Sequence, residues 1–203
     1  MSSAAHPTPT TQKILDIAER LVQTRGFNGF SYADIAKKLT VTKASLHYHF
    51  PSKNELGRAL IVRYEDVFDR ALDAIARATS DASEKLQRYA KLYDAVMRDD
   101  RMCLCGMLAA EYATLPASMQ EELRRFFRSN ERWLASVLED GRRRGQLAFR
   151  GSARERAALL LGALEGAMLV ARSCSDDRLF RSTAKRLLAD LAADGADGTG
   201  GKL

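Results

Sequence analysis

Cysteine, proline, histidine and long apolar runs are all scarce in this chain of 203 residues. The three cysteines, at positions 103, 105 and 174, are too few and too irregularly spaced to form a zinc site. No apolar run approaches the roughly 18 residues that a membrane-spanning helix needs, so we expect no membrane partner. The first residues lack the basic and apolar regions of a secretory signal, and we therefore expect a cytoplasmic protein.

Sequence motifs that perform catalysis are missing as well. The three histidines, His6, His47 and His49, all lie within the first 55 residues, and no Gly-rich phosphate loop follows a strand. No G-x-S-x-G sequence marks a nucleophile elbow. We therefore expect a protein that is not an enzyme and that uses neither a metal nor a cofactor.

What the chain has instead is helical periodicity, without an alternating strand pattern. Capping residues and apolar spacing predict an all-α fold of about nine helices, near residues 10–25, 32–39, 43–50, 53–78, 82–97, 101–114, 117–144, 153–172 and 176–193. We expect a disordered arm over 1–9, a three-helix domain over 10–55, a larger helical domain over 56–193 and a flexible tail over 194–203.

The stretch 31–55 predicts two short helices joined by a tight turn and followed by the start of a third helix. Ser31 is a good N-cap for the first helix, with Asp34 at its N3 position. Thr40 lies in the interruption between the two helices, and Thr42 can cap the second. This order predicts a helix-turn-helix.

The second of these helices has the composition of a helix that enters the DNA major groove. Leu46 and Phe50 lie four residues apart and anchor it inward, which leaves small, basic and hydroxylic side chains on the other faces. The first 55 residues also carry seven Lys and Arg against four Asp and Glu, which favours a polyanionic partner. The residues that we predict to contact double-stranded DNA are Ser31, Tyr32, Thr42, Lys43, Ala44, Ser45, His47, Tyr48 and Lys53.

The third helix begins with a capping box, because Glu55 follows Ser52 by three residues. The free N–H groups of its first turn, together with Lys53, predict a seat for a DNA phosphate.

The same residues occur in the order typical of a known family of regulators. The pieces are a Gly-Phe corner at 26–27, Ser-x-x-x-Ile-Ala at 31–36, a helix ending in His-Phe at 46–50 and Ser-Lys-x-Glu-Leu at 52–56. With these pieces the chain resembles the TetR family of bacterial transcription regulators. Thr40 departs from the family pattern, which usually has glycine in the turn.

The resemblance implies a function as well as a fold. Members of the family are homodimeric DNA-binding repressors that a small-molecule inducer releases from a palindromic operator. It therefore implies that residues 10–55 bind DNA and that residues 56–193 bind the inducer and form the dimer.

A cluster of small residues near the C-terminus predicts a surface where another helix can approach closely. Such a surface could pack within the monomer or form a two-fold four-helix interface, and the family resemblance favours the dimer. The residues predicted at this interface are Leu159, Gly162, Ala163, Gly166, Ala167, Leu187 and Leu191.

Aromatic and sulfur-containing side chains are concentrated between residues 89 and 133. Such a pattern is often core, but the family keeps its inducer pocket between these helices, and these side chains suit an apolar small molecule. The residues predicted to bind the inducer are Tyr89, Tyr93, Met97, Cys103, Met107, Phe126 and Trp133.

Two alternatives remain open from the sequence. Cys103 and Leu104 followed by Glu111 are similar to a pattern in TetR-type regulators that sense electrophiles through a cysteine, so the chain could be a thiol-based sensor. It could also be a helical ligand-binding protein without a DNA function.

The basic run at 142–144 falls at the end of a helix, where a favourable interaction with the helix dipole explains it.

Overall fold

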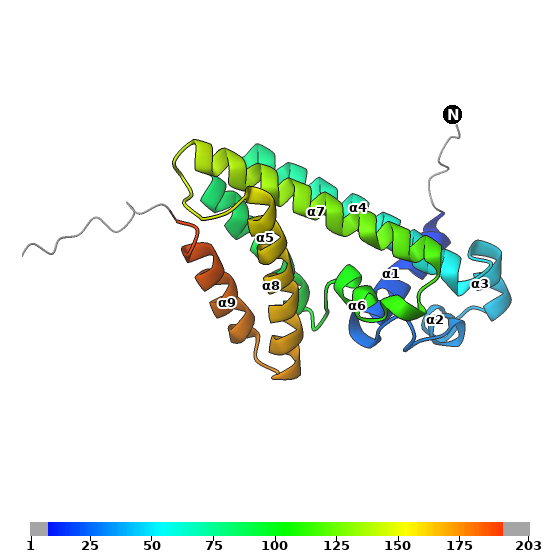
Figure 1. Ribbon diagram of the computed structural model, residues 1–203. Coiled ribbons are helices and arrows are strands. Elements are labelled where there is room, and N and C mark those ends of the chain that lie inside the picture. Colours follow the sequence, from blue (N-terminus) through cyan, green and yellow to red (C-terminus); the bar gives the residue numbers. More distant parts are fainter. Residues whose placement is uncertain (1–7, 193–203) are drawn as a thin grey trace, which may run out of the picture. The chain divides into compact units, whose positions relative to one another are not determined.

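A computed structural model describes residues 8–192, and the predicted all-α fold is confirmed (Figure 1). Within this range, nine α-helices and one short 3-10 helix account for the regular structure, with a single isolated bridge between Leu147 and Ala192. None of the helices in this range is long and apolar enough to cross a membrane. The helices are α1 (Pro9–Arg25), α2 (Tyr32–Leu39), α3 (Lys43–His49), α4 (Lys53–Ala78), α5 (Ala82–Arg98), α6 (Leu104–Ala110), the 3-10 helix η1 (Tyr112–Thr114), α7 (Ala117–Arg143), α8 (Ala153–Ser173) and α9 (Asp177–Ala189).

Most helices begin and end close to the predicted residues, and the exceptions include the N-terminal end of the chain. The tail predicted over 194–203 lies outside the described residues, as does most of the arm predicted over 1–9. α1 begins within that arm, at Pro9, because the Thr8 hydroxyl accepts a hydrogen bond from the Thr11 N–H at 3.2 Å. Proline is well tolerated there, since its missing N–H would have no helical partner in the first turn.

The sixth helix is shorter than the 101–114 predicted from the sequence. Cys103 is its N-cap, so the helix proper begins at Leu104. Ahead of it, the Met102 N–H donates to the Gln23 carbonyl at 3.1 Å and Arg101 donates to the Gln23 side chain. These bonds to α1 hold residues 101–102 outside the helix, and no feature of the local sequence announces them.

The chain forms two compact units, and they do not divide it at residue 55. The first unit comprises the chain up to Val67 together with Arg101–Phe126, and the second comprises Phe68–Asp100 with the chain from Phe127 onward. α4 and α7 each contribute residues to both units. α6 and the start of α7 therefore belong to the same unit as the three N-terminal helices. A domain division at a single point in the sequence, as predicted at residue 55, does not describe this grouping.

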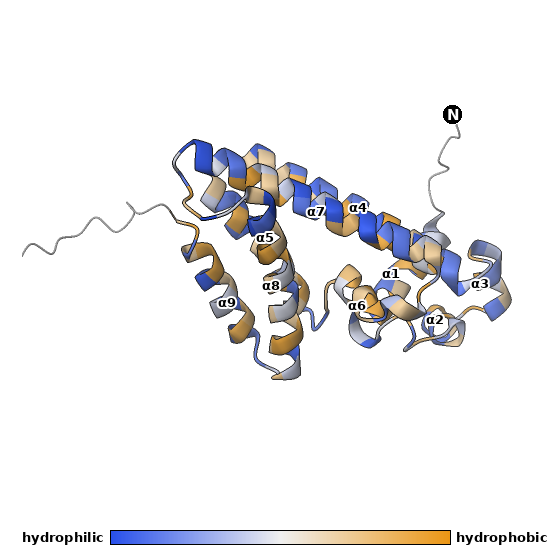
Figure 2. Cartoon of the chain, viewed as in Figure 1, coloured by the Kyte–Doolittle hydropathy of each residue, from blue (hydrophilic) through white to orange (hydrophobic). Residues whose placement is uncertain are grey.

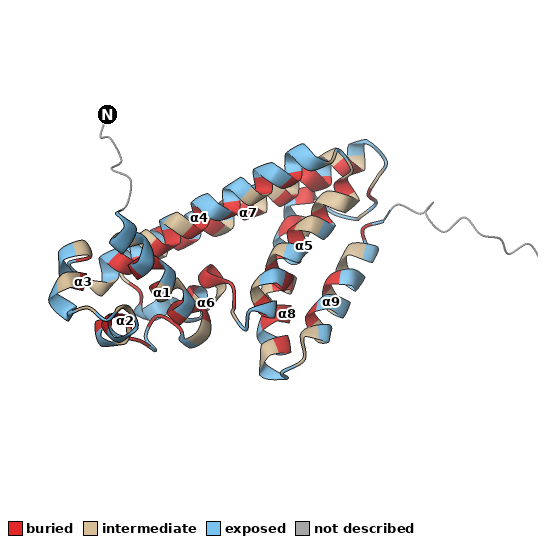
Figure 3. Ribbon diagram, turned by 180° about the vertical axis from the view of Figure 1, so that it is seen from behind, coloured by how far each residue is buried: buried red, intermediate tan, exposed pale blue. Residues whose placement is uncertain are grey.

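The first unit is built around the apolar faces of α1, α4, α6 and the start of α7. In Figure 3 buried residues recur along α4 and α7, as the helical period requires. α4 and α7 are joined by ion pairs in which Arg58 contacts Glu122 at 3.0 Å and Arg125 contacts Glu65 at 2.7 Å. The two carboxylates are nearly buried, so these pairs fix the register of one helix against the other.

The second unit places α5, α8 and α9 against one another, with apolar residues on the faces that meet (Figure 2). α8 begins with a capping box in which Ser152 and Glu155 exchange hydrogen bonds, and α9 begins at the Asp176 cap. The basic run at the end of α7 is paired with acidic side chains: Arg142 with Glu139, and residues 143 and 144 with Asp140. These local ion pairs account for the basic run within the protomer, in addition to the predicted interaction with the helix dipole.

Candidate nucleic-acid interface

α2 is held by the cap that the sequence predicts. The Ser31 N–H and hydroxyl both donate to the Asp34 carboxylate, at 2.8 and 2.7 Å. These two hydrogen bonds, the hydroxyl's first, lower the pKa of Asp34 below its ordinary value. Ile35 and Ala36 on the opposite face are buried in the first unit, so the start and the rotation of α2 are both fixed.

The turn between α2 and α3 has a left-handed residue at Thr40, with φ 56° and ψ 42°. The Val41 N–H returns to the Ala36 carbonyl at 3.1 Å and closes the turn. A β-branched side chain is poorly suited to this conformation, which costs an L-residue roughly 1–2 kcal/mol. The chain therefore carries strain at the position where the family usually has glycine.

α3 has one inward face and a wide outward face. Leu46 and Phe50 are buried at 1% and 8% exposure, as predicted, and the Thr42 hydroxyl caps the helix by accepting from the Ser45 N–H. The outward face carries four exposed side chains, of which Tyr48 is 86% exposed. These side chains are Lys43, Ala44, His47 and Tyr48.

The two histidines at the end of α3 make local contacts. A ring nitrogen of His47 lies 3.0 Å from the Pro51 carbonyl oxygen, and a ring nitrogen of His49 lies 3.1 Å from the Thr11 hydroxyl at the start of α1. The His47 side chain is nevertheless exposed, while His49 is half-buried. The end of α3 is thus tied to α1 without losing its outward face.

Tyr32 was predicted to contact DNA, and the structure places it in the interior instead. Its hydroxyl donates to the Phe50 carbonyl at 2.8 Å, and its ring packs against His47 at 4.8 Å between centroids. Burial, with a smaller contribution from the negative charge of Glu55, raises the pKa of Tyr32 to about 12. Its hydroxyl connects α2 to the end of α3 and is not presented to a phosphate.

Lys53 was also predicted as a phosphate contact, and it too is engaged within the first unit. Its ammonium donates to the carbonyls of Phe27 and Phe30, both at 2.5 Å, and lies over both aromatic rings. Desolvation lowers the pKa of Lys53, while the negative charges of Glu111 and Asp34 oppose that shift. Lys53 therefore fastens α4 to the corner after α1.

Glu111 has a part in this corner that the sequence did not reveal. Its carboxylate accepts hydrogen bonds from the Phe27 N–H at 2.6 Å and the Asn28 N–H at 3.2 Å. Gly26, at φ 82°, has no Cβ, and a Cβ there would lie 2.7 Å from the carboxylate. This contact joins residues 84 positions apart in the chain, so no local sequence pattern announces it.

Proteins of known family share both the sequence pattern and the fold. Residues 14–60 match the family described as "Bacterial regulatory proteins, tetR family". Residues 82–187, about half of the chain, match the family described as "Tetracyclin repressor-like, C-terminal domain". The chain belongs to the TetR family. The family resemblance inferred from the sequence is thereby confirmed, and the protein is a DNA-binding transcriptional regulator.

Individual TetR-family members match over most of the chain. A solved regulator from Agrobacterium tumefaciens is 34% identical, with a TM-score of 0.89 over 93% of this chain and 100% of that one. One from Legionella pneumophila is 32% identical, with a TM-score of 0.80 over 94% and 100%. The transcriptional repressor NemR of Escherichia coli is 26% identical over 167 residues, which are 80% of this chain and 84% of NemR.

The seven residues predicted to bind the inducer are divided between the two units. Tyr89, Tyr93, Met97 and Trp133 belong to the second unit, while Cys103, Met107 and Phe126 belong to the first. In the second unit Trp133 stacks on Tyr89, with 5.6 Å between centroids and 19° between the ring planes.

Buried polar groups accompany the aromatic rings of the second unit. The Tyr89 hydroxyl lies 3.0 Å from the Tyr93 hydroxyl and donates to the Asn130 side chain at 3.2 Å. All three side chains are at most 2% exposed. Asn130 was not among the predicted residues, because a lone asparagine in the middle of a helix gives no sequence signal of its own.

Within the first unit, Tyr64 contacts two of the residues predicted to bind the inducer, Phe126 and Cys103. Its ring lies 5.7 Å from that of Phe126, and its hydroxyl donates to the Cys103 sulfur at 3.8 Å. The sulfur also accepts the Gly106 N–H at 3.4 Å, as expected for an N-cap. Cys103 is only 2% exposed, so a reagent reaches it only when this part of the unit opens.

The residues predicted at the dimer interface fall into two groups. Leu159 and Gly162 are exposed on α8, and Ala163, Gly166 and Leu187 are half-buried.

The other two predicted interface residues are buried in the protomer. Ala167 is 9% exposed and Leu191 is 1% exposed, and the Leu191 carbonyl accepts the Ala148 N–H at 3.0 Å. These side chains pack within the second unit, so an outward face of α8 is better defined by Leu169 and Val170, which are 45% and 52% exposed.

Proposed function

We propose that this TetR-family regulator is a homodimeric repressor that binds a palindromic operator through α3 and leaves it when an apolar small molecule binds. The observation that carries the proposal is the outward face of α3, where Lys43, Ala44 and Tyr48 lie exposed on a helix anchored by Leu46 and Phe50. A short, rigidly held helix with such side chains suits insertion into a major groove.

Lys43 provides the most direct test of α3 as the reading helix. Lys43→Ala should weaken binding to every DNA sequence and lower the slope of log affinity against log salt by about 1 for each lost phosphate contact. The measurement is fluorescence anisotropy with DNA from upstream of the gene, at several salt concentrations. Lys85→Ala removes an equal charge from α5 and serves as the control; equal slopes for the two variants would eliminate α3 as the DNA-contacting element.

The homodimer is supported by the glycines of α8. A Cβ added at Gly162 or Gly166 would meet no heavy atom within 4 Å, so the protomer's own packing does not require glycine there. Glycine in a helix costs roughly 1 kcal/mol relative to alanine. Leu159, Leu169 and Val170 expose apolar surface beside these glycines, as a closely approaching partner helix would need.

The aromatic cluster of the second unit supports binding of an apolar inducer. Tyr89, Tyr93 and Trp133 supply ring surface, and the hydroxyls with Asn130 supply the few polar groups that orient a ligand. Because α4 and α7 contribute residues to both compact units, a ligand that repacks this cluster can bias the DNA-binding helices through them.

Reciprocity tests this coupling. The uncharged probe N-phenyl-1-naphthylamine should quench Trp133, the only tryptophan of the chain, and Trp133→Phe should abolish that signal. Probe affinity measured with and without saturating operator DNA must change by the same factor as operator affinity measured with and without probe, commonly about 5- to 150-fold. Identical probe affinities in the two states would show that this cluster does not control DNA binding.

A second candidate trigger is covalent, and the cap of α6 favours it. The Cys103 sulfur receives hydrogen bonds from Gly106 and Tyr64, so its alkylation would break the cap and push on α4. N-ethylmaleimide should modify the exposed Cys174 first without affecting DNA binding, and modify Cys103 more slowly with release of DNA. Cys103→Ser should abolish the release and Cys174→Ser should preserve it; release that survives in Cys103→Ser would exclude this trigger.

A further inference from the structure

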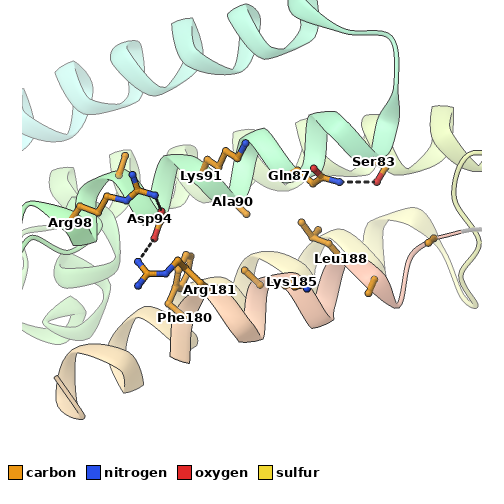
Figure 4. A pocket seen from close by; sticks show the side chains of 14 residues that line it. Ser83, Gln87, Ala90, Lys91, Asp94, Arg98, Phe180, Arg181, Lys185 and Leu188 are labelled. Atoms are coloured by element: carbon orange, nitrogen blue, oxygen red, sulfur yellow. Dashed lines mark hydrogen bonds and ion pairs between the residues drawn. The ribbon is translucent and has the colours of Figure 1, made fainter. Parts of the chain in front are cut away.

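A groove runs between α5 and α9 in the second unit (Figure 4). Its volume is about 790 Å³, which falls within the roughly 300–1,000 Å³ of small-molecule sites. None of the seven residues predicted to bind the inducer lines it. The groove is therefore a separate feature of the second unit, and it goes beyond the function proposed above.

The groove carries an excess of positive charge. Its lining includes four cationic side chains, from Lys91, Arg98, Arg181 and Lys185, and a single carboxylate, from Asp94. Asp94 accepts from Arg98 at 2.5 Å and from Arg181 at 3.2 Å, as the dashed lines in Figure 4 show. One carboxylate balances only one of the two guanidiniums, so a net positive charge remains beside Asp94.

The floor of the groove is apolar. Ala90 of α5 and Leu188 of α9 point toward one another between the helices (Figure 4). Phe180 and Ala184 extend this surface along α9 and are 1% and 6% exposed. Small residues on both helices leave the width of the groove open, while the long cationic side chains stand along its rim.

We propose that the groove binds an amphipathic carboxylate, of the class of medium- and long-chain fatty acids. The acyl chain lies on the floor between Ala90 and Leu188, and the carboxylate pairs with Arg98 and Arg181, whose planar forks match it in geometry. A cationic amphiphile would meet the excess of like charge, and a small hydrophilic anion would leave the floor unused. Charge and apolar surface together select the fatty acid.

Calorimetric titration with dodecanoate below its micelle concentration tests this proposal without DNA, so the result is independent of the operator. We expect one dodecanoate per protomer, with binding at least tenfold tighter than that of dodecanol or dodecyltrimethylammonium, which share its chain. Lys185→Glu should weaken dodecanoate at least tenfold. The matched control is Arg186→Glu, which makes the same charge change at the neighbouring residue. Arg186 is exposed, lies outside the groove and pairs with Asp190, so this variant should keep its dodecanoate affinity within twofold of the wild type.

A second variant addresses the floor. Ala95 is an exposed residue of the lining, and Ala95→Trp fills the groove without disturbing the buried core, so dodecanoate binding should be lost. Ala76→Trp, at an exposed position of α4 in the same unit, should bind normally. The proposal is overturned if wild-type protein does not bind dodecanoate, if dodecyltrimethylammonium binds as tightly, or if Ala95→Trp and Lys185→Glu both retain full affinity. Binding of an acidic amphipathic peptide in place of dodecanoate would also overturn it.

Discussion

Gly57 on α4 and Gly166 on α8 are both helical glycines, yet they have opposite explanations. At Gly57 a Cβ would lie 2.6 Å from Met119 and 2.7 Å from Phe27, so α4 can pack against α7 and the N-terminal corner only because this residue has no side chain. At Gly166 a Cβ would meet nothing within 4 Å. Packing within the protomer explains the first glycine but not the second, which is the position that the proposed dimer would use.

Other residues also divide into those whose role the protomer's own packing explains and those whose role it does not. Tyr32, Lys53 and Glu111 have the side chains of DNA or ligand contacts, but each is satisfied by backbone groups within the first unit. Leu159 and Val170, in contrast, are more than half exposed on α8 and have no role in the protomer's core. A side chain indicates a partner only where the protomer's own contacts leave it unexplained.

The largest effect should come from filling the space at Gly57. Gly57→Leu should lower the free energy of unfolding by about 3 kcal/mol, the upper part of the usual range for overpacking, because the Phe27 ring has little freedom to move away. Chemical denaturation monitored by circular dichroism measures the loss. Gly57→Ala should lose less, since the end of the Met119 side chain can turn aside, and full stability in Gly57→Leu would contradict this account of α4.

Gly166 should respond in the opposite way. Gly166→Leu should leave the helical content of the protomer unchanged and convert the dimer to monomer, because overpacking at an interface typically costs about 1–3 kcal/mol. Sedimentation at micromolar concentration measures the dissociation, and operator affinity should fall because each protomer reads one half-site.

The control for the α8 face is a position on the opposite side of the same helix. Met168 is fully buried, so Met168→Ala should destabilise the protomer before it changes the association state. A wild-type protein that sediments as a monomer, or a Gly166→Leu variant that remains a dimer, would remove α8 from the interface.

Glu111 tests whether the carboxylate at the C-cap of α6 stabilises the N-terminal corner. Glu111→Gln should cost about 1–3 kcal/mol, because the N–H groups of Phe27 and Asn28 lose a charged acceptor. Amide exchange at these two groups, together with thermal unfolding, reports the change. Glu121→Gln makes the same substitution at an exposed position of α7 and should be neutral within about 0.5 kcal/mol.

The sequence predicted the helices well because their caps and apolar spacing are local. Ser31 with Asp34, Thr42, and Leu46 with Phe50 all have the positions that these signals require. The site was predicted less completely, for a physical reason. Whether a basic or hydroxylic side chain faces solvent depends on carbonyls and N–H groups far away in the chain.

Lys53 and Cys103 illustrate that limit. Lys53 reaches carbonyls 23 and 26 residues earlier, and Cys103 caps α6 only because residues 101 and 102 bond to α1. No periodicity in the surrounding sequence encodes such contacts. The outward face of α3, by contrast, followed directly from its two inward anchors.

Thr40 is the reverse case to Gly166, because its left-handed backbone conformation favours glycine although the residue is threonine. Thr40→Gly should raise the free energy of unfolding by about 1 kcal/mol, since relief of the left-handed strain outweighs the greater chain entropy of glycine. Thermal unfolding should show an increase of a few degrees. Thr40→Asn should gain part of this, because asparagine tolerates the conformation, and Thr40→Val should gain nothing. If Thr40→Gly stabilises the fold but weakens operator binding, the exposed Thr40 hydroxyl contacts DNA, and the strain is kept for that contact. An unchanged melting temperature would show instead that the turn relaxes around threonine and that φ 56° carries no cost here.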